Sequence, residues 1–181
     1  MKKAAPGHGI HTLEEARAFV LETGICGIFS DAKGAMASLW NAVDLPHRQP
    51  GEKGWGEKVT VIWTWKNELP LRWPDEIFYG KTKGGLAVLL SMDYLRTQHY
   101  PRHHRPPDQC SALAQKIYGI LRLDPMTTKH LREELAITHP PARNQLDRAL
   151  QELQVTLNIV RRHGPATETD TWVPFFEQYS F

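Results

Sequence analysis

The chain has 181 residues, of which 41% are hydrophobic, and its formal net charge is +2. This length is enough for one large domain or two small ones, and the apolar content excludes wholesale disorder. Residues 1–100 carry 12 Lys/Arg and 11 Asp/Glu, and residues 101–181 carry 10 and 9, so each half has a net charge of +1. Neither half is strongly basic, so any nucleic-acid binding must come from local placement of charge.

The chain divides at a Pro-rich stretch. Residues 101–109, "PRHHRPPDQ", contain three prolines and no apolar periodicity, and consecutive prolines continue neither a helix nor a central strand. We interpret this stretch as a linker between an N-terminal unit at residues 12–100 and a C-terminal unit at residues 110–181. Residues 1–11 are expected to form a flexible tail.

The chain is expected to be cytoplasmic. Its first residues, "MKKAAPGHGIHT", have two lysines but no apolar stretch after them, unlike a secretory leader. No apolar run approaches the length of a membrane span. Cys26 and Cys110 lie far apart in the sequence and are interpreted as free thiols in a reducing compartment.

The N-terminal unit is predicted to contain helices and a hairpin. A helix over residues 12–23 begins with Thr12 and Glu15 at capping-box spacing, and Gly24 suits its C-terminal end. The other expected elements are a short helix at 35–43, an ambiguous segment at 57–69, two strands around Lys83–Gly85, and a helix at 92–99. This order makes a winged-helix-like unit plausible.

The C-terminal unit has clearer periodicity. Apolar residues at helical spacing predict a helix over 110–123, a shorter one after Thr127, and a long amphipathic helix over 142–160. A β-branched run, a Gly-Pro turn and a second short β-prone run then predict a hairpin. Helix, short helix, turn, long helix and hairpin is the order of a winged helix-turn-helix. The predicted fold class is therefore α+β, mainly helical, with two winged helix-turn-helix-like units joined by the Pro-rich linker.

No cofactor or metal is predicted. "YGKT" at residues 79–82 ends like a phosphate-binding loop, but the position of the required first glycine is Asp75. His99, His103 and His104 lie on the Pro-rich stretch, where little fixes a metal geometry. Among the tryptophans, Trp40 and Trp63 are expected in the core and Trp65 at the surface, where an aromatic ring can stack on unpaired bases.

The long helix carries the residue types of a DNA-reading helix. Arg pairs with guanine and Asn or Gln with adenine in the major groove, while basic residues nearby contact phosphates. The predicted nucleic-acid-binding residues are Lys129, Arg143, Asn144, Gln145, Arg148, Arg161, Arg162 and His163. Acidic residues on the same helix and hairpin partly cancel these charges, so a winged-helix protein-interaction module is the alternative.

The chain resembles the AlkZ-type winged-helix DNA glycosylases, and especially their short relatives. The resemblance rests on "EEARAFVLETGICGIF", "SLWNAV", "WTWKNELP…FYGK" and "RNQLDRALQELQVTLNIVRR…TWVPF", which together span most of residues 12–176. It implies tandem winged-helix units and DNA recognition. The chain is also shorter than these enzymes, so a further domain of theirs is expected to be missing.

The same resemblance argues against catalysis. These glycosylases have a Gln-x-Asp or Gln-x-Gln motif that positions the attacking water, and alignment puts Gly27, Ile28 and Phe29 there. No acid or amide remains in that place to polarise a water. We therefore expect a DNA-binding, repair-associated protein without glycosylase activity. An unrecognised enzyme in the N-terminal half, using the Trp-rich region and Asp31 or Glu57, is a further alternative.

Overall fold

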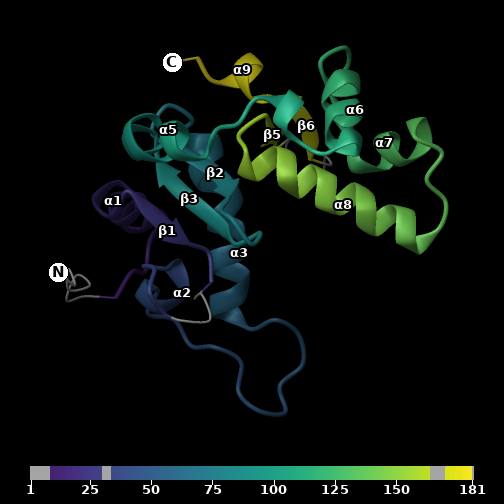
Figure 1. Cartoon of the computed structure of the whole chain (residues 1–181). Coiled ribbons are helices and arrows are strands. Elements are labelled where there is room, and N and C mark those ends of the chain that lie inside the picture. The colour runs from purple at the N-terminus through teal and green to yellow at the C-terminus, as the bar shows by residue number, and fades with distance from the viewer. Residues whose placement is uncertain (1–8, 30–33, 164–169, 181) are drawn as a thin grey trace. The chain divides into compact units, whose positions relative to one another are not determined.

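The computed structural model describes residues 9–29, 34–163 and 170–180, and the chain forms two units (Figure 1). The first comprises Met1–Tyr79 with Leu86–Leu95, and the second comprises Gly80–Gly85 with Arg96–Phe181. About half of the residues are helical, and the strands form two small antiparallel sheets. The predicted mixture of helices and sheets is thus confirmed. Among the described residues no helix combines the length and apolarity required to cross a bilayer.

The first unit builds its sheet from a strand and a hairpin that are distant in sequence. Its elements are α1 (Leu13–Thr23), β1 (Ile25–Gly27), α2 (Leu39–Ala42), α3 (Glu57–Arg72), β3 (Ala87–Ser91), α4 (Met92–Tyr94) and the beginning of β2 (Ile77–Lys81). Strand β3 lies between β1 and β2 and runs antiparallel to β1, with Cys26 opposite Leu89. Helices α1 and α3 bury their apolar sides against each other and against this sheet.

The ends of α1 follow the predicted capping chemistry. The Thr12 hydroxyl accepts a hydrogen bond from the Glu15 amide, and the Glu15 carboxylate accepts one from the Thr12 amide. Hydrogen bonds from the backbone amides of His11 and Thr12 to the Glu15 carboxylate lower the pKa of Glu15. Gly24 ends the helix at φ +74°, a conformation that glycine adopts without strain.

The ambiguous segment is helical, and this reverses the prediction for two tryptophans. In α3, Ile62, Trp65 and Leu69 follow the spacing of one helical face and are buried, with Trp65 only 8% exposed. Trp63 lies on another face and is 43% exposed. The predictions of a buried Trp63 and a surface Trp65 are therefore wrong, because they did not use the helical register. Trp40 packs against the core as expected.

The second unit packs three helices against a small sheet. Its elements are η1 (Leu95–His99), α5 (Tyr100–His103), η2 (Pro107–Gln109), α6 (Ala112–Leu121), β4 (Met126–Thr127), α7 (Thr128–Glu134), α8 (Pro140–Val155), β5 (Ile159–Arg162), β6 (Thr171–Pro174) and α9 (Phe175–Gln178). Strand β6 lies between β4 and β5 and is antiparallel to both. The predicted apolar positions of the long helix, from Leu146 to Leu153, lie in the core. The hairpin prediction is confirmed by the pairing of β5 with β6.

The Pro-rich stretch is folded onto the second unit. Its first residues continue a helix as far as His103. The His104 ring Nδ1 then lies 3.1 Å from the Thr156 carbonyl, and the Asn158 amide donates to the Arg105 carbonyl at 2.9 Å. These contacts hold residues that were expected to form an open linker.

One glycine offers a simple test of the second unit's helix α6. Gly119 is exposed within this helix, and a Cβ built there meets no heavy atom within 4 Å. Gly119→Ala should raise the free energy of unfolding by about 0.5–1 kcal/mol, because alanine loses less backbone entropy in a helix. Denaturant unfolding followed by circular dichroism measures this change. Gly24→Ala, which places a Cβ 2.9 Å from Tyr94 at φ +74°, should instead destabilise; a loss of stability in Gly119→Ala would contradict the helical assignment.

Candidate nucleic-acid interface

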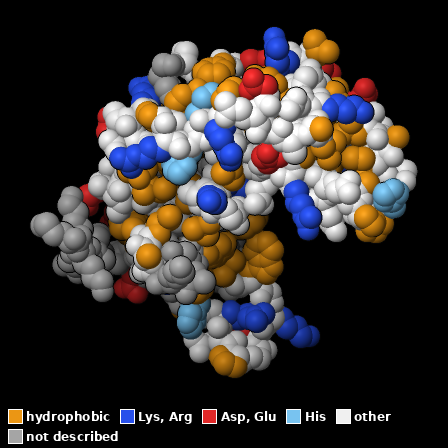
Figure 2. Space-filling model, in the orientation of Figure 1, with side chains coloured by type: hydrophobic (Ala, Val, Ile, Leu, Met, Phe, Trp, Pro, Cys, Tyr) orange, Lys and Arg blue, Asp and Glu red, His pale blue; other side chains and the backbone are white. Residues whose placement is uncertain are grey.

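Helix α8 presents a polar face at its N-terminal half. The His139 ring caps the helix, and Pro140 and Pro141 form its first turn, where a missing amide hydrogen has no cost. Leu146 and Ala149 turn into the core. The polar side chains around these two residues are exposed, and they include four of the predicted DNA-reading residues, namely Arg143, Asn144, Gln145 and Arg148. Figure 2 shows basic side chains at the surface over this helix, among uncharged polar ones.

The two arginines of this face remain available to a ligand. Arg143 donates one hydrogen bond to the Thr138 carbonyl at 3.1 Å, which directs it along the start of the helix. The nearby Asp147 carboxylate lies 3.7 Å from a different residue, Arg132. Over the described ranges, no carboxylate forms an ion pair with Arg143 or Arg148. The Asp147 charge on α8 is thus partly neutralised from α7.

Gln145 and Arg148 also border a groove between α6 and α8. A cavity of about 360 Å³ lies there, lined by Ser111, Leu113, Gln145, Arg148, Ala149 and Glu152. The Glu152 carboxylate accepts hydrogen bonds from the Ser111 hydroxyl at 2.6 Å and from its amide at 3.0 Å. Glu152 therefore stabilises the start of α6, and its charge is partly offset by these donors.

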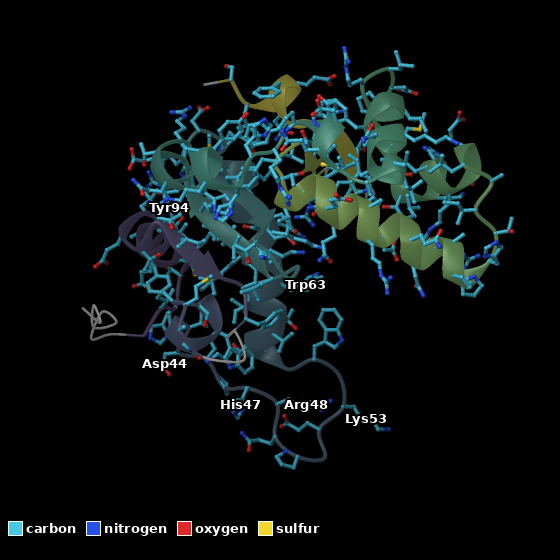
Figure 3. The ribbon with its side chains drawn as sticks, in the orientation of Figure 1. Asp44, His47, Arg48, Lys53, Trp63 and Tyr94 are labelled. Atoms are coloured by element: carbon cyan, nitrogen blue, oxygen red, sulfur yellow. The ribbon has the colours of Figure 1, made fainter. Side chains whose placement is uncertain are left out.

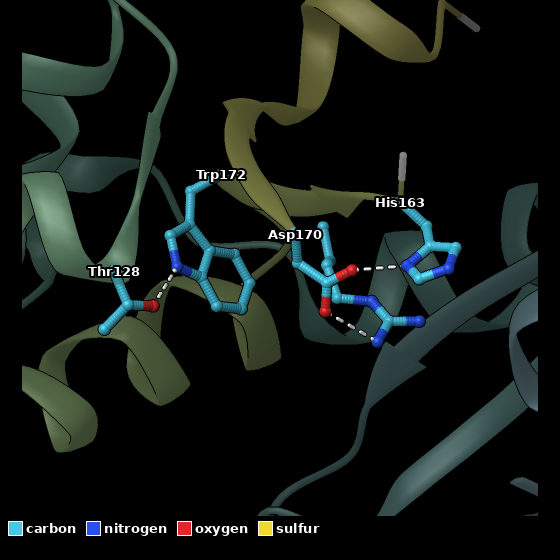
Figure 4. A network of polar contacts seen from close by, with 5 residues as sticks. Thr128, His163, Asp170 and Trp172 are labelled. Atoms are coloured by element: carbon cyan, nitrogen blue, oxygen red, sulfur yellow. Dashed lines mark hydrogen bonds and ion pairs between the residues drawn. The ribbon is translucent and has the colours of Figure 1, made fainter. Parts of the chain in front are cut away.

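Of the predicted DNA-binding residues on the hairpin, some contact Asp170 within the hairpin and one is exposed to solvent (Figure 4). Arg161 Nη1 lies 2.9 Å from Asp170 Oδ2, and the Arg161 side chain is only 10% exposed. His163 Nδ1 contacts the other oxygen of Asp170 at 2.5 Å. Arg161 and His163 therefore brace the two strands, whereas Arg162 is exposed. Residues 164–169, which contain the predicted turn, lie outside the described residues.

A side-chain hydrogen bond joins the hairpin to α7. The Trp172 indole donates to the Thr128 hydroxyl at 2.8 Å, next to Lys129 on the first turn of α7. Lys129 is 80% exposed, and its ammonium lies 3.9 Å from Glu133, a contact that contributes little at this exposure. Lys129 and Arg162 thus extend from elements that the Trp172 contact holds together.

The segment expected to replace the catalytic motif is packed into the first unit. Gly27 pairs with Val88 across the sheet, and a Cβ at Gly27 would lie 2.8 Å from the Phe29 carbonyl oxygen. Ile28 is 1% exposed. An amide side chain at Gly27, the first motif position, would therefore need backbone movement. Phe29, at the third motif position, is half-buried and carries no polar group. Asp31 lies outside the described residues, and Glu57 is exposed at the start of α3.

Neither cysteine is an activated nucleophile. Burial raises the pKa of Cys26 to about 12, and burial likewise raises the pKa of Cys110. Both thiols are therefore protonated at neutral pH. Within the part of the chain that is described, no group of three or more His, Cys, Asp or Glu residues is arranged to hold a metal ion.

The first unit contains a second feature that sequence reasoning missed. A cavity of about 720 Å³ is lined by Phe29, Trp40, His47, Arg48, Gly54, Trp55, Val59 and Trp63. The Trp-rich composition indicated an aromatic surface. The lining residues, however, come from the segment after β1, from α2, from the following loop and from α3, so no local sequence pattern predicts that they lie together.

The geometry defines a mixed α/β protein with a polar, partly basic helix face in one unit and an aromatic cavity in the other. The sequence profile of the AlkZ-related family matches residues 10–170, and the chain belongs to this family. The resemblance noted from its sequence is thereby confirmed at the level of the family. Comparisons with curated proteins and with solved structures find no significant match.

Proposed function

We propose that the protein binds duplex DNA through α8, using α6, α7, α8 and the β5–β6 hairpin as a winged helix-turn-helix. The carrying observation is the exposed set of Arg, Asn and Gln side chains on the N-terminal half of α8, opposite its buried apolar side. This is the part of a recognition helix that meets base edges in the major groove. Membership of the AlkZ-related family supports the same proposal.

In the proposed complex, each exposed residue has a role that fits its chemistry. Arg143 and Arg148 donate to guanine edges or phosphates, and Asn144 and Gln145 pair with adenine edges. Lys129 and Arg162 contact the phosphate backbone on either side. Arg161 and His163 hold the hairpin through Asp170.

We further propose that binding occurs without glycosylase chemistry at the position of the family's motif. Gly27 and Phe29, at the first and third positions of the motif, offer no group that polarises water, and Gly27 is buried while Phe29 is half-buried. The enclosed backbone at Gly27 supports this proposal, because the amide that the glycosylases use would need the Phe29 carbonyl to move. Incubation with alkylated or crosslinked duplex should release no base; release would overturn this part of the proposal.

Salt dependence tests the duplex proposal directly. With about three phosphate contacts, a fourfold rise in salt should weaken binding about 40-fold, because each contact displaces condensed counterions. Fluorescence anisotropy of a labelled duplex measures the affinity. Lys129→Gln and Arg162→Gln should each reduce the logarithmic salt slope by about one. Absence of binding at low salt would refute the proposal and favour a protein-interaction module.

A further inference from the structure

The aromatic cavity of the first unit has the size and lining of a ligand site. Its volume of about 720 Å³ falls in the range typical of small-molecule pockets. Figure 3 labels Trp63 on α3, and His47 and Arg48 on the loop between α2 and α3. In Figure 2, apolar side chains reach the surface over α3, with basic side chains beside the loop that precedes it. The cavity therefore combines aromatic surface with positive charge.

Two of the tryptophans offer exposed rings. Trp55 is 61% exposed and Trp63 is 43% exposed, and their rings meet edge to face at 80°, with centroids 5.6 Å apart. Contiguous exposed aromatic surface on a protein commonly marks a site that binds a ligand or a partner. The neighbouring rings of Trp55 and Trp63 form such a surface at the cavity. An edge-to-face pair presents two perpendicular walls, each able to stack on a flat ring.

The opposite wall is fixed by contacts around Trp40. The His47 ring stacks on Trp40 with an interplanar angle of 16°, and the Lys58 ammonium lies 4.9 Å from the Trp40 ring centroid. Phe29 packs against the same indole with ring centroids 6.0 Å apart. These neighbours occupy Trp40, so it shapes the cavity. The Trp55 ring and the part of the Trp63 ring that Lys66 leaves uncovered remain to contact a ligand.

Positive charge lies around the rings. Arg48 lines the cavity, and one of its N–H groups donates to the Gly54 carbonyl at 3.0 Å, which positions the guanidinium along the loop. Lys66 is 4% exposed, and its ammonium lies 3.8 Å from the Trp63 ring centroid. Among the described residues that line the cavity, none is acidic. A flat ring that carries an anionic group matches this arrangement.

We propose that this cavity binds a single unpaired nucleobase together with its phosphate, the base stacking on one of the two perpendicular rings of Trp55 and Trp63 and meeting the other edge to face, and the phosphate meeting Arg48. The base supplies the flat π surface, and the phosphate supplies the charge that the guanidinium recognises. The chemistry is shared by a free nucleotide and by a nucleotide within a single strand. The inference goes beyond duplex binding by α8 and does not depend on it.

The test compares small ligands on the full chain. Tryptophan fluorescence is titrated with AMP, adenosine and ribose 5-phosphate. AMP should bind more tightly than either of the others. Trp63→Ala and Trp55→Ala should each weaken AMP binding, about 5- to 150-fold for the variant that removes the stacking ring and less for the one that removes the edge-to-face contact. Arg48→Gln should reduce the affinity for AMP to that for adenosine. Both tryptophans are exposed, so unchanged thermal unfolding of the variants verifies that they fold.

Three results would overturn the proposal: no saturable AMP binding, ribose 5-phosphate binding as tightly as AMP, or wild-type affinity in both tryptophan variants. The source of the nucleotide is resolved by a single-stranded oligonucleotide. Tighter binding of the strand than of AMP identifies a strand ligand, and equal binding identifies a free nucleotide; each outcome supports the shared chemistry. Arg148→Glu should leave AMP binding unchanged while weakening duplex binding, so failure of the α8 proposal and failure of this one are distinguishable.

Discussion

Arg148→Glu is expected to weaken duplex binding at least tenfold at moderate salt. The wild-type guanidinium is exposed on α8 beside Gln145, and the described residues place no carboxylate in an ion pair with it. A well-placed arginine contact to DNA contributes about 1–3 kcal/mol, and reversal of its charge adds repulsion from the phosphates. The loss should appear in anisotropy titrations with a labelled duplex.

The control for this variant carries the same change of charge at another place in the same unit. Arg102 is exposed on α5 and donates to Gln98 at 2.8 Å. Helix α5 lies away from the start of α8 in Figure 1. Arg102→Glu should change affinity by less than about threefold, because exposed charges beyond a Debye length are screened. Equal losses in both variants would indicate only a general charge effect and would contradict docking of α8.

Acidification from pH 6.5 to pH 4 is expected to cost the protein about 3 kcal/mol of unfolding free energy through His99 alone. The ring is 4% exposed, and burial, followed by repulsion from His103, lowers the pKa of His99 to about 4. An unfolded histidine has a pKa near 6.5, and each unit of difference corresponds to about 1.4 kcal/mol. The unfolded state therefore binds the proton first, so stability is complete above pH 6.5 and falls as the pH approaches 4.

Denaturant unfolding across this pH range measures the effect. His99→Phe, which keeps an aromatic ring but cannot be protonated, should flatten the dependence between pH 6.5 and pH 4. His130→Gln, at an exposed position on α7, should retain the wild-type slope. A wild-type profile without a decline, or an equal decline in His99→Phe, would show that folding does not lower the pKa of His99.

Local sequence patterns predicted many of the helices and strands, but they did not predict in every case which side chains are buried and which are exposed. Thr12 with Glu15, and Gly24 after α1, carry capping chemistry that acts within a few residues, so the sequence identified them. The 3.6-residue repeat of α8 likewise identified its buried side. The segment before Trp73 mixes β-branched and helix-forming residues, so only packing against α1 decided that it is helical. In that helix Trp65 is buried and Trp63 is exposed, the opposite of the prediction.

The candidate sites show the same division. The exposed Arg, Asn and Gln residues of α8 follow from its periodicity, which is a property of one continuous segment. In contrast, the Asp170 contacts that remove Arg161 from the surface join two strands, and no periodic pattern encodes that pairing. The sequence pattern also did not predict that the Trp172 indole donates a hydrogen bond to Thr128 on α7.

The sequence by itself determined the family, the helix caps, the amphipathic α8 and the hairpin after it, because each depends on residues close together in the chain. Only the tertiary structure decided that the Pro-rich stretch folds onto Thr156 and Asn158, and that Phe29, Trp40 and Trp63 surround one cavity. Those arrangements bring together residues far apart in sequence. Packing between distant segments determines these arrangements, and such packing produces no periodic pattern in the sequence.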